Sequence, residues 1–347
     1  MTASAKTTIP LDAPQDMLSQ ILSHLRDDHG MAFRAKGAGG HVYEQDGYRV
    51  EFALRTGALD VRLKAPGESA MQFSKEGMVH HIAEFDPALA EGIRWQGLSQ
   101  EAGTAPSNFR LLTVRNSEVL FEGMQRVTLH YPDIGKLARQ GLHLRLVLPC
   151  DPARRPVWPV MGANGAPVWP QGEDALHARY VTLKNIRPES EEVDIDIVRH
   201  GAGLISRWAQ GAREGQQIGA MGPVGISALP EAASYFIAAD GTGLPVVAQL
   251  LSRLTQDAVG DVVVALPDTV RPDAYLPPTN LRVHCLPPAV FDAQVFDTAL
   301  ELTTPGTEYG FFAGEFANAQ RLRKHFKGPL GLGKSQQLST AYWRKAA

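Results

Sequence analysis

Cysteine is scarce in this 347-residue sequence, in which only Cys150 and Cys285 occur, far apart and in no CxxC pair. The sequence therefore supports neither a disulfide scaffold nor an iron–sulfur cluster held by cysteines. We expect both thiols to be small residues of the hydrophobic core.

Long apolar segments are lacking as well, since no run of about 18 uninterrupted apolar residues occurs. The first ten residues, MTASAKTTIP, contain no apolar run of the kind found in a secretory signal. We therefore expect a cytoplasmic protein without a membrane span. The net charge of −3 is small and gives no reason to expect a nucleic-acid partner.

Acidic residues are absent from residues 321–347, although this stretch holds seven basic ones. One interpretation is a solvated helix face followed by a basic tail, which is the commoner arrangement. The other is a binding site for an anion, such as a phosphate or the carboxylates of a metal chelate. The basic residues are Arg321, Arg323, Lys324, Lys327, Lys334, Arg344 and Lys345.

The length of the sequence indicates three folded domains, because a chain of 347 residues is too long for one ordinary hydrophobic core. Residues 1–95 predict a small α+β domain. It contains an amphipathic helix over 12–30, a hairpin over 50–63 and a second helix over 71–85. The aperiodic, polar stretch 96–107 then indicates a linker.

Residues 108–228 predict an antiparallel β-barrel, because short strand signals follow one another with turns between them. The expected strands are 109–114, 125–131, 143–148, 180–184, 193–198 and 217–221. A loop over 149–172 interrupts this series. Its six prolines indicate extended backbone, and its two tryptophans indicate a packed, functional loop.

Residues 229–347 predict a Rossmann-like parallel α/β sheet, because strand and helix signals alternate. The expected strands are 235–239, 261–266, 281–286 and 310–313, with helices over 244–254 and 315–327. The fold class is thus multi-domain α/β.

Two segments of the predicted barrel could together bind a pyrophosphate. Arg179 on a strand would neutralise its charge, while Ser206 and backbone N–H groups near Gly203 would cradle it at a helix start. Each segment alone is more often an ordinary strand or helix cap. Their order, ahead of a wound α/β domain, favours a flavin site.

Three segments of the α/β domain could bind a second nucleotide. Residues 239–245 form a strand-to-helix turn of small residues where backbone can approach a phosphate, although an ordinary tight turn would look alike. Residues 313–315 form another such turn, which could meet a nicotinamide from the side. Residues 341–345 predict either a docked tail that covers a ring system or a frayed end, and Trp343 favours docking.

Together these segments resemble the siderophore-interacting protein family over about residues 108–347. The family patterns H-G-x-G-x-x-S-x-W-A and G-P-x-G correspond to residues 200–209 and 222–225, and this chain, like the family, nears its end with Tyr-Trp-Arg. The resemblance implies a barrel of ferredoxin-reductase type that binds FAD and a Rossmann-like domain that binds NADPH or NADH. It also implies an enzyme that reduces Fe(III) to Fe(II) in a ferric siderophore.

The resemblance further implies a set of cofactor-binding residues: Arg179, Val181, Thr182, Lys184, His200, Gly203, Ser206, Asp240, Thr242, Pro245, Gly314, Glu315, Tyr342 and Trp343. Anionic ferric chelates would bind Lys184, Arg344 and Lys345. No side chain is expected to act as a catalytic acid, base or nucleophile, because the flavin carries the chemistry. No metal ligand is assigned.

The sequence departs from the family pattern at Val181, where the family has a tyrosine that packs against the isoalloxazine. Loss of this aromatic contact predicts flavin binding weaker by about 1 kcal/mol. Two other functions therefore stay open. One is a non-catalytic protein that binds a siderophore or tetrapyrrole, and the other is a general flavin reductase that uses free flavin.

The N-terminal part of the chain carries His24, Gly47, Leu59, a given spacing to His81, and Phe85. With these residues it resembles a small domain of uncharacterised function that is sometimes joined to this reductase family. Its histidines His24, His29, His80 and His81 raise a metal or haem hypothesis. The spacing of five between His24 and His29, and the adjacency of the other two, places neither pair on one helical face. Core or surface histidines are the commoner explanation.

Overall fold

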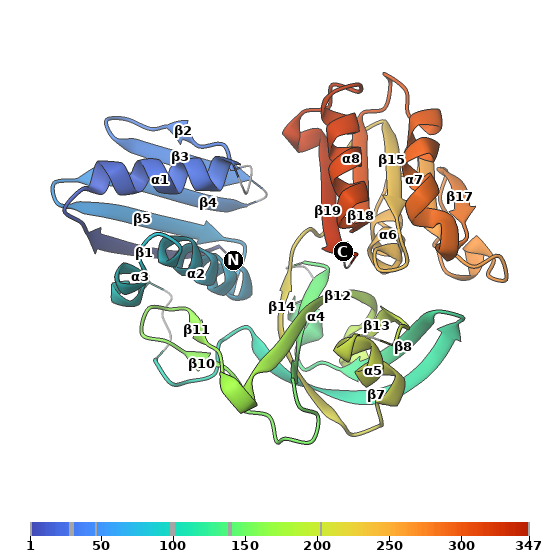
Figure 1. Cartoon of the computed structure of the whole chain (residues 1–347), viewed down its shortest axis with the longest axis horizontal. Helices are drawn as coiled ribbons and strands as arrows, with labels where there is room; N and C mark the ends of the chain where they lie inside the picture. Colours follow the sequence, from blue (N-terminus) through green and yellow to red (C-terminus); the bar gives the residue numbers. More distant parts are fainter. Residues whose placement is uncertain are drawn as a thin grey trace. The chain divides into compact units, whose positions relative to one another are not determined.

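The computed structural model describes residues 2–27, 31–45, 47–97, 101–137, 141–201 and 203–345 (Figure 1). Its contacts divide the chain into two compact units. The first unit comprises residues 1–111, 145–179 and 219–224, and the second comprises residues 112–144, 180–218 and 225–347. Barrel strands belong to both units, so the three-domain boundaries stay a prediction.

A six-stranded sheet of order β2-β3-β4-β5-β1-β6 forms the N-terminal part of the first unit. The elements are β1 (Ala3–Pro10), α1 (Pro14–Asp27), β2 (Arg34–Ala35), β3 (Gly40–Gln45), β4 (Tyr48–Arg55), β5 (Ala58–Ala65), α2 (Glu68–Ala83), α3 (Pro87–Gly92) and β6 (Gln96–Gly97). Helices α1 and α2 lie on one face of the sheet (Figure 1). The apolar stripe of α1 packs in the same core as alternate residues of β5. This confirms the predicted helices and hairpin. His29 lies outside the described residues.

A closed barrel of order β12-β13-β8-β7-β14-β9 follows. Its elements are β7 (Phe109–Phe121), β8 (Met124–His130), α4 (Ile134–Leu137), β9 (His143–Pro149), β12 (Leu176–Arg187), β13 (Glu192–Val198), α5 (Leu204–Gly211) and β14 (Gln217–Val224). All six predicted strands are confirmed, and β7 and β12 are longer than predicted. The loop over 149–172 contains a short hairpin, β10 (Val160–Met161) with β11 (Pro167–Val168). Both of its tryptophans, Trp158 and Trp169, pack against a small apolar cluster around Phe109, so the loop is packed as predicted.

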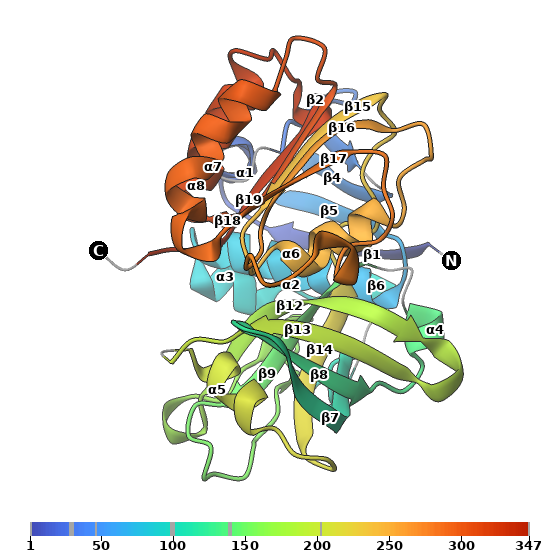
Figure 2. The same cartoon turned by 90° about the vertical axis from the view of Figure 1, so that its right-hand side faces the viewer.

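A five-stranded sheet of order β17-β16-β15-β18-β19 forms the C-terminal part of the second unit, and all its neighbouring strands are parallel. The elements are β15 (Ser234–Ala239), α6 (Leu244–Leu251), β16 (Val259–Ala265), β17 (Arg282–Leu286), α7 (Pro288–Leu302), β18 (Tyr309–Glu315), α8 (Phe316–Lys327) and β19 (Gln337–Trp343). Helices α7 and α8 lie side by side on one face (Figure 2), and α6 packs on the other. The predicted Rossmann-like architecture is confirmed.

Four expectations need correction. Cys150 and Cys285 are exposed rather than in the core. The strand β1 was not predicted, because its inward positions are Ala5, Thr7 and Ile9, of which only the last is strongly apolar. Helix α7 was missed, and the chain end forms strand β19 instead of a tail.

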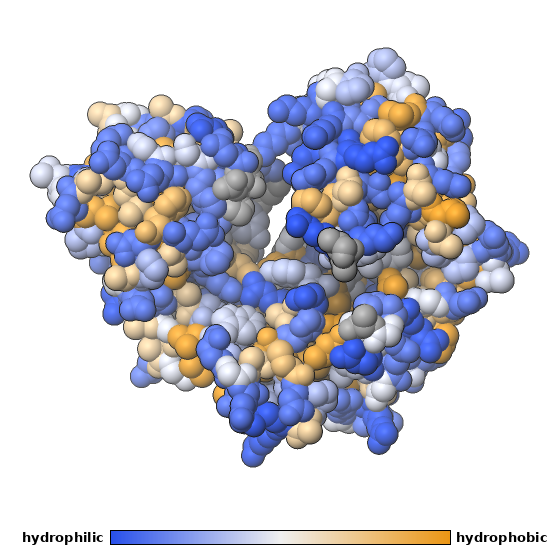
Figure 3. Space-filling view, in the orientation of Figure 1, coloured by the Kyte–Doolittle hydropathy of each residue, from blue (hydrophilic) through white to orange (hydrophobic). Residues whose placement is uncertain are grey.

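The face drawn in Figure 3 is mainly hydrophilic, with apolar residues in small scattered groups. In the described part of the chain, no helix combines the length and apolar character needed to cross a membrane.

Candidate functional site

The strand order of the C-terminal sheet reverses between β15 and β18, and the region at the carboxyl ends of these two strands is called the crevice. The chain runs outward from β15 through β16 to β17 and then returns to add β18 and β19 on the other side of β15. Ligands of open parallel sheets bind at such a reversal point, beyond the carboxyl ends of the strands. The predicted turn 239–245 leads from the end of β15 into α6. Residues 313–315, predicted as a turn, are instead the last residues of β18 and lead directly into α8. The structure brings both segments together at this crevice.

Asp240 organises the first turn. Its Oδ1 accepts hydrogen bonds from the Thr242 amide at 2.7 Å, the Thr242 hydroxyl at 2.5 Å and the Gly243 amide at 3.2 Å. Pro245 stands in the first turn of α6, where its missing N–H leaves no donor unpaired. The amides of Thr242 and Gly243 are therefore engaged by Asp240 and are not offered to a phosphate.

Two glycines allow the turns to approach each other closely. A Cβ on Gly314 would lie 2.7 Å from Oδ2 of Asp240, and a Cβ on Gly243 would lie 2.5 Å from the carbonyl oxygen of Ala313. Both distances are shorter than van der Waals contact, so side chains at these positions would force the turns apart.

Glu315 completes the second turn by capping α8. Its Oε2 accepts from the amides of Ala317 at 2.6 Å and Asn318 at 3.3 Å, a favourable arrangement at the positive end of a helix. Burial and the carboxylates of Asp240 and Glu315 raise the pKa of Asp292. The crevice therefore has an acidic floor, which suits an uncharged nicotinamide ring better than a phosphate.

The aromatic pair at the end of β19 also reaches this crevice. The Trp343 indole Nε1 donates to Oδ2 of Asp240 at 2.6 Å, although the residue keeps 37% of its surface exposed. The hydroxyl of Tyr342 lies 2.8 Å from Nε2 of His143 at the start of β9. Burial, with Asp240 nearby, raises the pKa of Tyr342, so the phenol stays neutral and can donate or accept here.

The two terminal cations lie next to the acidic residues. The guanidinium of Arg344 stacks over the Phe316 ring at 3.8 Å, and the backbone N–H of Lys345 donates to Oε1 of Glu315 at 3.3 Å. Both side chains are exposed, so both can meet an anion in solvent.

The predicted phosphate loop of the barrel closes on the start of α5. The His200 amide donates to Oγ of Ser206 at 2.8 Å, and the Gly203 amide donates to the His200 ring at 3.3 Å. A Cβ on Gly203 would lie 2.5 Å from that ring, so a side chain here would have to displace the His200 ring. The structure thus brings His200, Gly203 and Ser206 together at the N-terminus of α5.

Strand β12 carries the remaining predicted flavin residues. Arg179 is exposed and donates to the carbonyl of Ala178, while Val181 is half-buried and Thr182 is buried. Exposed Arg179 keeps its charge available to an anion.

Lys184, on the same strand, is buried. Only 8% exposed, its Nζ lies 3.8 Å from Asp196, and it sits over the Tyr275 ring at 3.2 Å from the centroid. Burial lowers its pKa from 10.5 to about 8 despite the attraction of Asp196. Lys184 thus belongs to a buried polar cluster, and its predicted roles in binding substrate and cofactor stay predictions.

The other residues of this buried cluster belong to no local sequence motif, and the sequence analysis did not identify them. Arg126 donates two hydrogen bonds to Asp196, at 2.7 and 2.8 Å, and the Tyr275 hydroxyl donates to the same carboxylate at 2.7 Å. The alternation of Asp194 and Asp196 with apolar residues in β13 was the one available signal, since paired inward acids require cationic partners.

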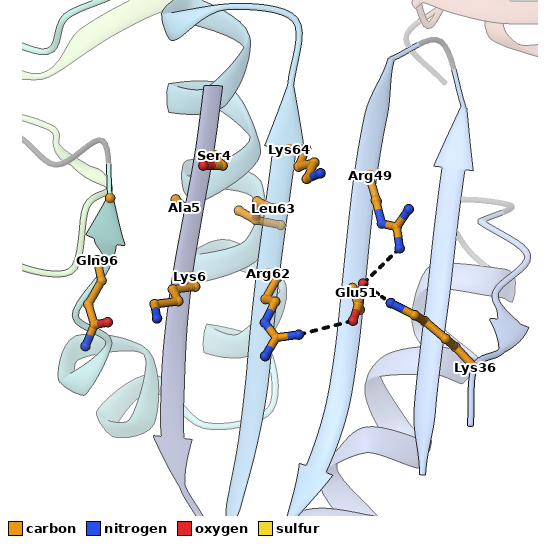
Figure 4. Close-up of a pocket in the computed structure, with 11 residues that line it drawn as sticks. Ser4, Ala5, Lys6, Lys36, Arg49, Glu51, Arg62, Leu63, Lys64 and Gln96 are labelled. Carbon is orange, nitrogen blue, oxygen red and sulfur yellow. Dashed lines mark hydrogen bonds and ion pairs between the residues drawn. The ribbon is translucent and has the colours of Figure 1, made fainter. Parts of the chain in front are cut away.

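A separate cationic pocket of about 460 Å³ lies on the sheet of the first unit, on the face away from α1 and α2 (Figure 4). Five basic side chains line it, and one carboxylate, Glu51, lies among them. Lys36 and Arg49 donate to Glu51 at 2.8 and 3.0 Å, and they outweigh burial and lower its pKa. The basic lining residues are Lys6, Lys36, Arg49, Arg62 and Lys64.

Known proteins are similar in sequence to about two-thirds of this chain. The ferric vibriobactin reductase ViuB of Vibrio cholerae is 27% identical over 245 residues, which cover 68% of this chain and 89% of that protein. The NADPH-dependent ferric-chelate reductase of Escherichia coli is 28% identical over 243 residues, which cover 68% of this chain and 92% of that protein.

Solved structures show the same fold. The siderophore-interacting protein SipS of Aeromonas hydrophila superposes with a TM-score of 0.57 at 24% identity, over 69% of this chain and 93% of that one. A siderophore utilization protein from T. fusca gives 0.56 at 25% identity, over 71% and 97%.

Two family models match, and residues 1–112 precede both of them. Residues 113–227 match the siderophore-interacting FAD-binding domain and residues 232–346 match the siderophore-interacting protein model. The chain therefore belongs to the siderophore-interacting protein family.

Proposed function

We propose that this chain is a flavin-dependent NAD(P)H oxidoreductase that reduces Fe(III) to Fe(II) in ferric siderophores. The main support is the crevice at the reversal point of the parallel sheet, in a chain that also carries an FAD-binding domain. Relatives named ferric vibriobactin reductase and NADPH-dependent ferric-chelate reductase support the same chemistry.

The flavin fits residues of β12 and of the α5 loop. Exposed Arg179 would neutralise the pyrophosphate, and Val181 and Thr182 would border the ring system. The loop of His200, Gly203 and Ser206 is held in shape by its own hydrogen bonds, so the N-terminus of α5 needs little reorganisation to receive a phosphate. When bound, FAD would accept hydride from the nicotinamide and deliver electrons singly to the iron.

The nicotinamide end of NADPH or NADH fits the crevice between the two turns. Gly243 and Gly314 let the two turns pack closely at the base of this region, where a Cβ on either glycine would clash with the opposite turn. Asp240 and Thr242 shape one wall, with Pro245 starting the helix behind them, while Glu315 shapes the other. Tyr342 and Trp343 would cover the meeting point of the two ring systems.

The substrate is an anionic ferric chelate. Arg344 and Lys345 are exposed, and cations at this place would raise the local concentration of an anion. Because the reaction consumes reduced nicotinamide nucleotide, we further propose a cytoplasmic location. We also propose that the chain comprises three domains, residues 1–95, 108–228 and 229–347.

The visible absorption spectrum of the purified chain tests this function. Flavin bands should bleach on anaerobic addition of NADPH or NADH and return when a ferric siderophore is added, while a ferrous-specific chelator traps the product. Gallium siderophore is the matched control, because Ga(III) resembles Fe(III) but is not reduced under these conditions. Bands that bleach but do not return would refute the reductase.

A general flavin reductase is the second candidate, and Val181 favours it because a weak aromatic contact suits a flavin that leaves. Purified chain without flavin would then oxidise NADPH only when free flavin is supplied. A chain that binds ferric siderophore but neither flavin nor NADPH would instead be a non-catalytic binding protein.

A further inference from the structure

Two histidines and a carboxylate from separate helices meet in the first unit, outside the proposed redox site. Nε2 of His24 on α1 lies 3.0 Å from Nδ1 of His81 on α2 and 3.3 Å from Oε2 of Glu84, the C-cap residue that directly follows α2. All three ligand atoms lie within 4.8 Å of one another. The sequence did not predict this meeting, because His24 and His81 are 57 residues apart.

These separations match the edges of a metal coordination polyhedron. Ligands about 2.0–2.1 Å from a metal ion are about 3.3 Å apart in a tetrahedron and about 2.9 Å apart in an octahedron. The observed 3.0 and 3.3 Å fall in this range. The third pair, His81 and Glu84, lies within 4.8 Å, so an ion can bind once side-chain movements bring this third separation into the same range.

Rigid elements hold the three ligands. His81 and Glu84 are three residues apart at the end of α2 and share one side of it. Leu25, next to His24, and Ile82, next to His81, are almost wholly buried in the core between the helices and the sheet. Both helices are thereby fixed on the same sheet face, which is the support that a metal site requires.

The surroundings favour binding from one side. The Phe85 ring packs edge-on against the His24 ring with centroids 5.6 Å apart, and the His24 side chain is only 13% exposed, whereas Glu84 is 41% exposed. His80 holds the other carboxylate oxygen of Glu84 at 3.2 Å. A partner of this kind orients a ligating carboxylate.

We propose that His24, His81 and Glu84 bind a divalent first-row transition-metal ion. Two imidazoles and one carboxylate suit Zn(II), Co(II) and Fe(II), and this set leaves further positions open for water or another ligand. Fe(II), the product of the proposed reduction, belongs to this class, but the site stands on its own geometry and does not depend on that reaction.

Calorimetric titration of the chelator-treated full chain with Zn(II) tests the site, with elemental analysis of the metal kept after gel filtration. We expect one ion per chain. Glu84→Gln and His81→Asn should each weaken binding more than about 100-fold, since loss of a mere orienting partner costs about 10- to 100-fold. His80→Ala should fall in that smaller range, and His41→Ala, in the same domain but outside the cluster, should bind like the parent.

Thermal melting separates lost ligands from lost folding. Metal should raise the melting temperature of the parent and of His41→Ala, whereas Glu84→Gln should melt near the metal-free parent and show no rise. No stoichiometric binding by the parent, or equal binding by a folded Glu84→Gln, would overturn the site. Anaerobic competition between Fe(II) and Zn(II) then identifies the ion that the site prefers.

Discussion

Lys184 offers the most quantitative test of how the barrel is built. Burial lowers the pKa of its ammonium from 10.5 to about 8, and Asp196 only partly offsets this effect. Because the folded-state pKa is the lower one, the stability associated with the neutral amine is fully present above pH 10.5 and is lost as the pH falls through about 8. The difference corresponds to about 3 kcal/mol of unfolding free energy.

Lys184→Met removes the charge and keeps an unbranched apolar side chain. We expect the variant to be more stable than the parent at pH 7 by up to about 3 kcal/mol. This advantage should shrink by about 2 kcal/mol between pH 7 and about pH 9.5 as the ammonium of the parent loses its proton. Urea unfolding of the parent and the variant at both pH values measures this advantage. Subtracting the unfolding free energies of the two proteins cancels the contributions of groups that titrate alike in both.

Two results would refute this reasoning. An advantage that stays constant with pH to within about 0.5 kcal/mol would show that no buried ammonium titrates at this position. A raised KM for the ferric chelate in Lys184→Met, with unchanged stability and flavin content, would instead support its predicted role in substrate binding.

Three further variants test the proposed cofactor and substrate contacts. Gly314→Ala should displace the Asp240 carboxylate, because its methyl would lie 2.7 Å from Oδ2. It should raise the KM for NADPH about tenfold at unchanged flavin content, and an unchanged KM in steady-state kinetics would exclude this turn from the nucleotide site. Val181→Tyr should tighten FAD by about 1 kcal/mol in an equilibrium titration; equal tightening by Val181→Leu would show that aromatic stacking is not the cause. Replacing Arg344 and Lys345 together by alanine should raise the KM for an anionic ferric chelate several-fold at low salt and less at high salt. A neutral chelate is the control, and an equal rise for both chelates would argue against a charge effect.

Local patterns predicted most of the fold, because they repeat within one element. The six barrel strands and the alternation of β15, α6 and β16 are readable from short apolar runs between turns. Helix α7 also carried a signal, since Phe291, Val295 and Ala299 are buried four residues apart, but the sequence prediction did not use it. Strand β19 could not be recognised in this way, because its polar and apolar residues do not alternate and it becomes a strand only by pairing with β18.

The contacts within the candidate sites can likewise be divided into those between residues close in the sequence and those that only the tertiary structure brings together. By itself the sequence determined which residues carry the family motifs, since His200, Gly203 and Ser206, or Asp240 and Thr242, lie within a few residues of each other. Only the tertiary structure decided that Trp343 meets Asp240, 103 residues away, and that Lys184 is buried. The same holds for the meeting of His24 and His81. Such contacts depend on strand order and helix packing, which no local periodicity encodes.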